Sequence, residues 1–147
     1  MRKNVIEIGI DPGVTTGFAL ACDGVLAEVT SMTAVAAELR ALELFGAVDC
    51  MTTVTVLFED ARLRTWFGRK GREALQGAGS VKRDCSRWEE FLLHHGIPFR
   101  PVPPKANATK LNAAHFARLT GWSRRTNEHG RDAACLVFKR RIQGASA

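Results

Sequence analysis

Two acidic residues stand directly after apolar runs, and a third lies far along the chain. Asp11 follows VIEIGI, Glu59 follows VTVLF, and Asp132 lies in NEHGRDAACLVFKR, three residues after His129. Residues at the carboxyl ends of neighbouring strands can share one pocket. Carboxylates gathered there repel one another unless a cation is present, and hard oxygen ligands favour Mg²⁺ or Mn²⁺. We therefore predict that the three acids form a metal site.

Each acid also has a simpler explanation when it is taken alone. An Asp before Pro-Gly is often a turn residue, a Glu at a strand end is often solvated, and an Asp in the first helical turn often interacts with the helix dipole. The case for a metal site therefore depends on the elements that bring Asp11, Glu59 and Asp132 together.

The apolar pattern predicts five strands. The strand that ends before Glu59 is β-branched and nearly all apolar, which is typical of a strand buried on both faces of a parallel sheet. Asp23-Gly24 between two apolar runs predicts a tight antiparallel hairpin. IPFRPVPP predicts a short strand whose prolines confine it to an edge. The predicted strands cover residues 5–10, 15–21, 25–30 and 53–58 together with part of this proline-containing run.

Helical periodicity predicts four helices between and after these strands. In the first helix Val35, Ala36, Leu39, Leu42 and Phe45 are expected to be the apolar contacts, and Gly46 is expected to end it. The predicted helices cover residues 33–45, 71–95, 109–119 and about 130–142. This order of elements predicts a single α/β domain over residues 1–147 with a mixed sheet.

Basic charge is concentrated in the second part of the chain. Acids outnumber Lys and Arg by six up to Ala61, whereas Lys and Arg outnumber acids by twelve from Arg62 onward. This asymmetry favours a face that meets a polyanion, although a merely soluble basic surface is the alternative. ARLRTWFGRKGR interleaves basic and aromatic residues, which suits phosphate contacts and base stacking, while its aromatic residues could instead be core or dimer contacts. The predicted DNA contacts are Arg62, Arg64, Trp66, Phe67, Arg69, Lys70, Arg72, Lys105 and Lys110.

The composition is that of an ordinary globular protein, with 46% hydrophobic and 24% charged residues. The absence of an apolar run of about 18 residues and the early acid in MRKNVIEIGID predict a cytoplasmic protein without membrane contact. Whether it is bacterial or phage-encoded and acts in the host cytoplasm stays open. Cys22, Cys50, Cys85 and Cys135 form no ligand cluster, so reduced and buried thiols are expected.

Several stretches resemble the RuvC-like Holliday-junction resolvases of the ribonuclease H-like superfamily. They are IGIDPGVTTGFAL, VLFED, HGRDAACLV and, more loosely, GSVKRDCSRWEEFLLHHGIPFRPVPP, which together cover most of the chain. The resemblance implies a five-stranded sheet, an antiparallel meander followed by parallel strands, flanked by helices. It also implies catalytic carboxylates on the first strand, the fourth strand and the last helix, where Asp11, Glu59 and Asp132 stand. His129 takes the place of a further acid or histidine one turn earlier.

For the activity, the resemblance implies a homodimer that cuts opposed strands of a four-way DNA junction. Each active site would use two Mg²⁺ or Mn²⁺ ions about 3.5–4 Å apart, bridged by Asp11 and completed by Glu59 and Asp132. His129 would position the water or the phosphate, or relay a proton. Alternatives are a ribonuclease H-like nuclease acting on RNA or RNA/DNA hybrids, a non-catalytic branched-DNA binder, and a phosphate-binding ATPase fragment.

Overall fold

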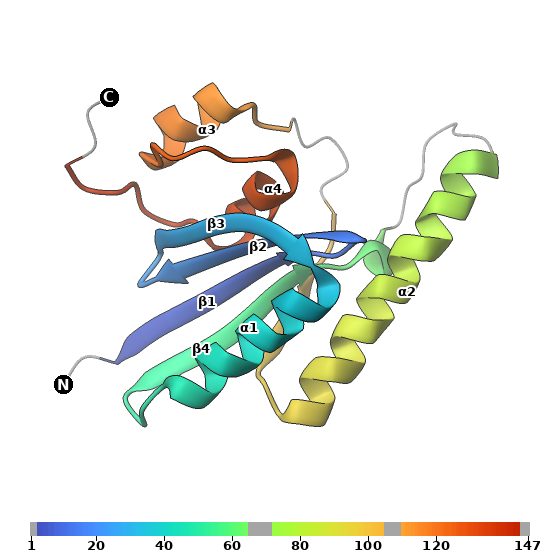
Figure 1. Ribbon diagram of the computed structural model, residues 1–147, viewed down its shortest axis with the longest axis horizontal. Helices are drawn as coiled ribbons and strands as arrows, with labels where there is room; N and C mark the ends of the chain where they lie inside the picture. Colours follow the sequence, from blue (N-terminus) through green and yellow to red (C-terminus); the bar gives the residue numbers. More distant parts are fainter. Residues whose placement is uncertain (1–2, 65–71, 105–109, 145–147) are drawn as a thin grey trace.

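A computed structural model describes residues 3–64, 72–104 and 110–144, with side chains omitted for residues 72–78. Five strands form one mixed sheet in the order β3-β2-β1-β4-β5 (Figure 1). The strand β2 is antiparallel to both β1 and β3, whereas β4 runs parallel to both β1 and β5. The bounds are β1 Asn4–Asp11, β2 Thr15–Cys22, β3 Val25–Thr33, β4 Thr52–Glu59 and β5 Phe99–Val102. The predicted fold class is confirmed, and β5 is an edge strand as expected.

The predicted hairpin between β2 and β3 is also confirmed. Asp23 and Gly24 have φ angles of +52° and +84°. Two consecutive residues with positive φ are the mark of the tight type I′ turn, whose twist matches that of the flanking strands. The strands β2 and β3 therefore pair in the register that this turn sets.

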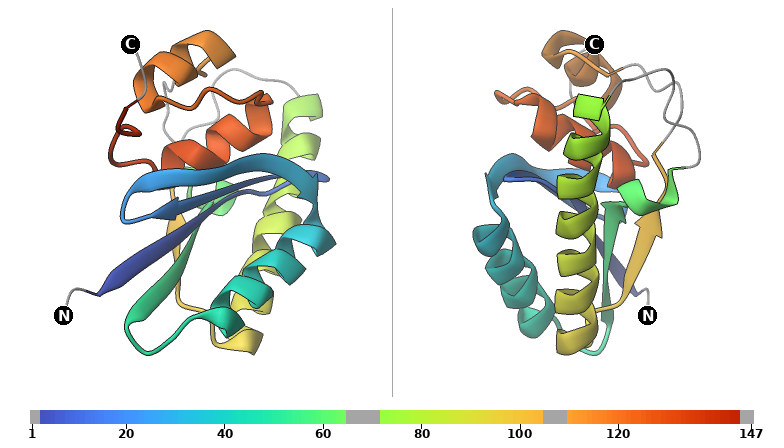
Figure 2. Two further views of the ribbon diagram at one scale, coloured as in Figure 1. Left: turned by 60° about the vertical axis from the view of Figure 1, so that its left-hand side comes forward. Right: turned by 90° about the vertical axis from the view of Figure 1, so that its right-hand side faces the viewer.

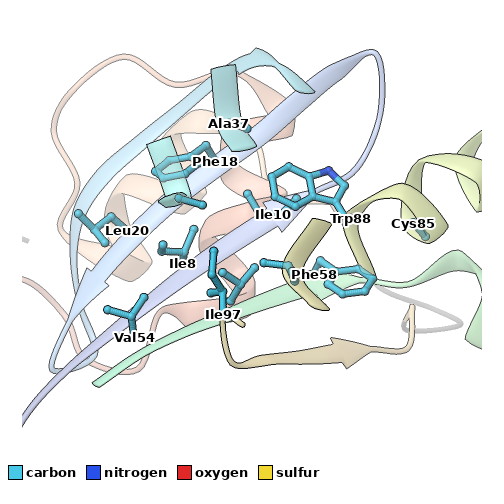
Figure 3. Close-up of a cluster of buried hydrophobic side chains, with 13 residues drawn as sticks. Ile8, Ile10, Phe18, Leu20, Ala37, Val54, Phe58, Cys85, Trp88 and Ile97 are labelled. Carbon is cyan, nitrogen blue, oxygen red and sulfur yellow. The ribbon is translucent and has the colours of Figure 1, made fainter. Parts of the chain in front are cut away.

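Helices cover both faces of the sheet. The helices α1 and α2 lie on one side, and α3 and α4 lie on the other (Figure 2). One core cluster joins Ile8, Ile10 and Phe58 of the sheet to Trp88 and Leu92 of α2 (Figure 3). A second cluster packs under α3 and α4. The bounds are α1 Ala34–Ala47, α2 Arg72–His95, α3 Ala113–Thr120 and α4 Glu128–Val137, with a short 3₁₀ helix η1 at Ala61–Leu63.

The helix α1 differs from its prediction in its end and in its buried face. It continues through Gly46 to Ala47, because Gly46 does not adopt the left-handed conformation of a helix-ending glycine and the chain turns extended only at Val48. Val35 and Leu39 are 53% and 61% exposed, whereas Ala37 and Ala41 are fully buried. The expected apolar contacts are therefore wrong at Val35, Leu39 and Ala36, which is also exposed, because this helix approaches the sheet through Ala37 and Ala41.

The last two helices are also displaced from their predicted ranges, and both begin at asparagine caps. The Oδ1 of Asn112 accepts a hydrogen bond from the His115 amide at 2.8 Å, so α3 begins at 113 rather than 109. The Oδ1 of Asn127 accepts one from the Gly130 amide at 2.9 Å, so α4 begins at Glu128 and ends well before 142. An asparagine cap accepts a hydrogen bond from a backbone N–H group that the first helical turn leaves unpaired. It therefore locates the start of a helix better than apolar periodicity does.

The cysteines are free, as expected, but only Cys85 is buried. The prediction of buried thiols is wrong for Cys22, Cys50 and Cys135, which lie exposed. Within the described segments, none of the helices is both long enough and apolar enough to cross a membrane.

The backbone of α4 lies directly against β1 and β2. A Cβ added to Gly17 would stand 1.9 Å from the carbonyl oxygen of His129, and one added to Gly9 would stand 2.2 Å from that of Ala133. Glycine in a strand often marks such a close backbone approach. These two positions therefore fix the height of α4, with His129 and Asp132, above the sheet.

We predict that Gly17→Ala destabilises the protein by about 1–3 kcal/mol or more, because the new methyl group must push α4 off β2. Urea denaturation followed by circular dichroism measures this loss. Gly46→Ala is the matched control, because it lies inside a helix with open space around it and should gain about 0.5–1 kcal/mol. Equal effects of the two substitutions would contradict the close contact of α4 with the sheet.

A candidate active site at the carboxyl ends of β1 and β4

The structure places the three predicted acids at one edge of the sheet. The strands β1 and β4 pair in parallel with Ile10 opposite Phe58, and the next residue of each strand is an acid, Asp11 and Glu59. Asp132 lies on α4, which packs on β1 and β2. Asp11 and Asp132 are mostly buried, and Glu59 is half-buried. Three separate elements thus present carboxylates to one region.

Their electrostatics show that these carboxylates interact. Burial raises the pKa of Glu59 above its usual value, and the negative charges of Asp11 and Asp132 raise it further. Burial also raises the pKa of Asp11, with Asp132 adding to the effect, while His129 and Lys110 oppose it. The negative charges beside Asp11 and Glu59 therefore make these two carboxyls costlier to ionise.

A histidine and a lysine side chain lie against this group. The Nδ1 of His129 is 3.3 Å from Oδ2 of Asp11. The Nζ of Lys110 is 3.2 Å from Oδ2 of Asp132, and this contact raises the pKa of Lys110. His129 and Asp132 both lie in α4, the condition under which their spacing places them on one face, although the first-turn acid of α4 is Glu128 rather than Asp132.

Asp11, Glu59 and Asp132 could hold a divalent metal ion. Three partly buried carboxylates that repel one another offer the oxygen ligands and negative charge that suit Mg²⁺. As the side chains are placed, no group of three His, Cys, Asp or Glu residues in the described part of the chain is drawn together around a common point for an ion. Asp132 and Asp11 instead contact Lys110 and His129, so a metal ion would take the place of these contacts.

The turn after Glu59 is fixed by a different set of charges. Asp60 is 1% exposed, and the guanidinium of Arg62 donates to its Oδ1 at 2.9 Å and to its Oδ2 at 2.8 Å. The same guanidinium contacts Glu89 of α2, and the thiol of Cys85 donates to the carbonyl of Glu59 at 3.6 Å. This network ties η1 to α2 and holds the end of β4 in place.

The predicted DNA contacts are only partly covered by the described residues. Arg62 belongs to the network with Asp60, whereas Arg64 is exposed beside the site and lowers the pKa of Glu59. Lys110 contacts Asp132. The contacts predicted for these three residues stay predictions. Arg72 lies in α2, but its side chain is not described. The remaining predicted contacts lie outside the described residues, and they are Trp66, Phe67, Arg69, Lys70 and Lys105.

Sequence reasoning missed two features that shape this site. It treated Lys110 as a DNA contact and did not foresee its ion pair with Asp132, which stands 22 residues later. It also overlooked Gly17, whose lack of a side chain lets His129 approach Asp11. The glycine inside the apolar run TTGFALA was the available signal, because a glycine in a strand often marks a close approach.

Comparisons with known proteins give no assignment: no family model matches the chain, and no curated protein matches it.

We predict that Glu59→Gln stabilises the metal-free protein at pH 7. A carboxyl whose folded pKa is raised binds its proton more tightly in the folded state than in the unfolded state. Its contribution to the free energy of unfolding is therefore present at acid pH and is lost as the pH rises through the folded pKa. Gln removes the ionised form. The melting temperature in EDTA should therefore exceed that of the wild type at pH 7, by about 2–4 °C for each kcal/mol gained.

The difference between Glu59→Gln and the wild type should shrink as the pH falls toward 4.5, where Glu59 is increasingly protonated in both folded and unfolded chains. Glu43→Gln, at an exposed residue of α1, is the control and should stay within about 0.5 kcal/mol of the wild type. A Glu59→Gln protein that melts below the wild type at pH 7 would contradict the mutual repulsion of the acids.

Proposed function

We propose that this protein is a divalent-metal-dependent endonuclease that cuts branched DNA, of the RuvC-like type. The observation that supports this proposal is the placement of Asp11 and Glu59 at the carboxyl ends of β1 and β4 beside Asp132 of α4. There the charge of Asp132 raises the pKa of Asp11, and the charges of Asp11 and Asp132 raise the pKa of Glu59. Such an arrangement costs stability, so a purely structural role does not account for it. A cation that arrives with the substrate would offset the cost.

In this proposal Asp11, Glu59 and Asp132 hold Mg²⁺ or Mn²⁺, two ions per site, which activate water and stabilise the leaving oxygen of a phosphodiester when bound. His129 acts at its Nδ1, 3.3 Å from Oδ2 of Asp11, where it can accept a proton or orient the water. The two partners fix each other's orientation, because α4 is held close to β2 at Gly17.

The basic part of the chain supplies the contacts to the DNA backbone. Arg64 and Lys110 lie near enough to the acids to lower the pKa of Glu59, so they stand where a phosphate at the site would meet positive charge. Lys and Arg contacts of this kind bind phosphates without reading sequence. Recognition of a four-way junction would then rest on its shape and on two sites in a homodimer, related by two-fold symmetry.

A cleavage panel tests the proposal. We predict that the protein with Mg²⁺ introduces paired, symmetric nicks into a four-way junction, leaves linear duplex intact, and is inactive in EDTA. Asp11→Asn should lower the cleavage rate more than about a hundredfold, because several kcal/mol of charge stabilisation are lost with a metal ligand. The same variant should bind the junction as well as the wild type or better, since a negative charge beside the phosphates is removed.

The other outcomes of the panel distinguish the alternatives. Cleavage of RNA/DNA hybrid alone would replace the proposal with a ribonuclease H-like activity. Tight junction binding without cleavage in Mg²⁺ or Mn²⁺ would indicate a non-catalytic binder. Normal cleavage by Asp11→Asn would remove the metal assignment. Sedimentation with and without the junction measures whether the active species is the proposed dimer.

A further inference from the structure

The ion pair between Lys110 and Asp132 joins an exposed cation to a partly buried anion. Its Nζ–Oδ2 distance is 3.2 Å, and the two side chains are 69% and 26% exposed. Lys110 lies just before Asn112, the cap of α3, whereas Asp132 is fixed on α4 against the sheet. The ammonium therefore reaches Asp132 from the solvent side, on a long flexible stem.

The influence of this ammonium extends to the whole group of acids. It lowers the pKa of Asp11 and of Glu59, and the negative charges of Asp132, Glu128 and Asp11 raise the pKa of Lys110 itself. Lys110 thus supplies, within one chain, part of the positive charge that the acids would otherwise take from a metal ion.

The ammonium and a divalent ion held at this site would compete for the same carboxylate. Both are positive, so an ion held by Asp132 repels the Lys110 ammonium at hydrogen-bond distance from that carboxylate. A DNA phosphate offers the displaced ammonium a new anionic partner. Movement of Lys110 from Asp132 to a phosphate would therefore free the carboxylate at the moment when substrate arrives.

We infer that Lys110 couples metal binding to DNA binding by neutralising Asp132 in the free protein and exchanging that carboxylate for a DNA phosphate in the complex. The inference rests on the proposed function for the identity of the metal and the nucleic acid. Because coupling between two ligands is reciprocal, DNA raises the affinity for the metal by the factor by which the metal raises the affinity for DNA.

The first experiment measures Mn²⁺ binding to the full chain by calorimetry without DNA. Lys110→Met should bind Mn²⁺ about fivefold more tightly than the wild type or better, since 5-fold is the lower end of ordinary couplings. Arg118→Met removes one positive charge from an exposed position on α3 and should change the affinity by less than about twofold, because solvent and salt screen an exposed surface charge. Lys110→Arg keeps the charge and should stay near the wild type.

The second experiment measures four-way junction affinity by fluorescence anisotropy, in EDTA and in Ca²⁺, which shares the preference for oxygen ligands. The wild type should bind the junction at least about fivefold more tightly with Ca²⁺, Arg118→Met should keep this ratio, and Lys110→Met should reduce it toward one. Melting curves in EDTA confirm that each variant is folded at the temperature of the assay.

The outcomes separate this inference from the function on which it rests. If the wild type and all variants bind neither Mn²⁺ nor Ca²⁺, the metal-dependent function falls together with the coupling. If the wild type binds metal and cuts junctions while Lys110→Met matches Arg118→Met in both experiments, only the coupling is overturned. Weaker Mn²⁺ binding by Lys110→Met would also overturn it, since Lys110 would then assist the metal rather than compete.

Discussion

The close contact between α4 and the sheet is the constraint on which the rest of the structure depends. With no side chain at Gly9 or Gly17, the carbonyl groups of α4 rest on the strands themselves. Ala133 and Ala134, both fully buried, continue this small-residue surface along the helix. The acids of β1 and β4 leave the sheet at its edge, and only a helix held this low can bring a third acid and a histidine beside them.

The same contact makes the site electrostatically costly. Lowering α4 onto β1 and β2 removes water from Asp11 and adds the charge of Asp132, and both effects raise the pKa of Asp11. Two core clusters, one on each face of the sheet, hold the elements in place against this repulsion. Sites that bind charged ligands are commonly less stable without the ligand, because the ligand supplies the opposite charge that the site lacks.

Much of this arrangement was predictable from the sequence, because strand ends follow directly from apolar runs. Asp11 and Glu59 were placed correctly by this rule alone, and the Asp23-Gly24 pair set the hairpin. The start of α4 was missed because apolar periodicity does not locate a cap such as Asn127. The exposure of Leu39 was missed for another reason. A helix with alanines on one side and larger apolar residues on another can dock by either, and the choice depends on how much room the sheet leaves.

Two basic residues with the same predicted role, Arg62 and Lys110, differ in the ion pairs that they form. Arg62 and Lys110 were both predicted to contact DNA, on grounds of charge and position in the chain. The planar guanidinium of Arg62 forms ion pairs with the carboxylates of Asp60 and Glu89. Because Asp60 is almost fully buried, removing Arg62 would leave a buried charge without its ionic partner. Lys110 meets its carboxylate from solvent on a flexible stem, and a phosphate can replace that partner at little cost. The surplus of twelve positive charges after Ala61 therefore overstates what is free to meet a polyanion, because part of it holds the fold together.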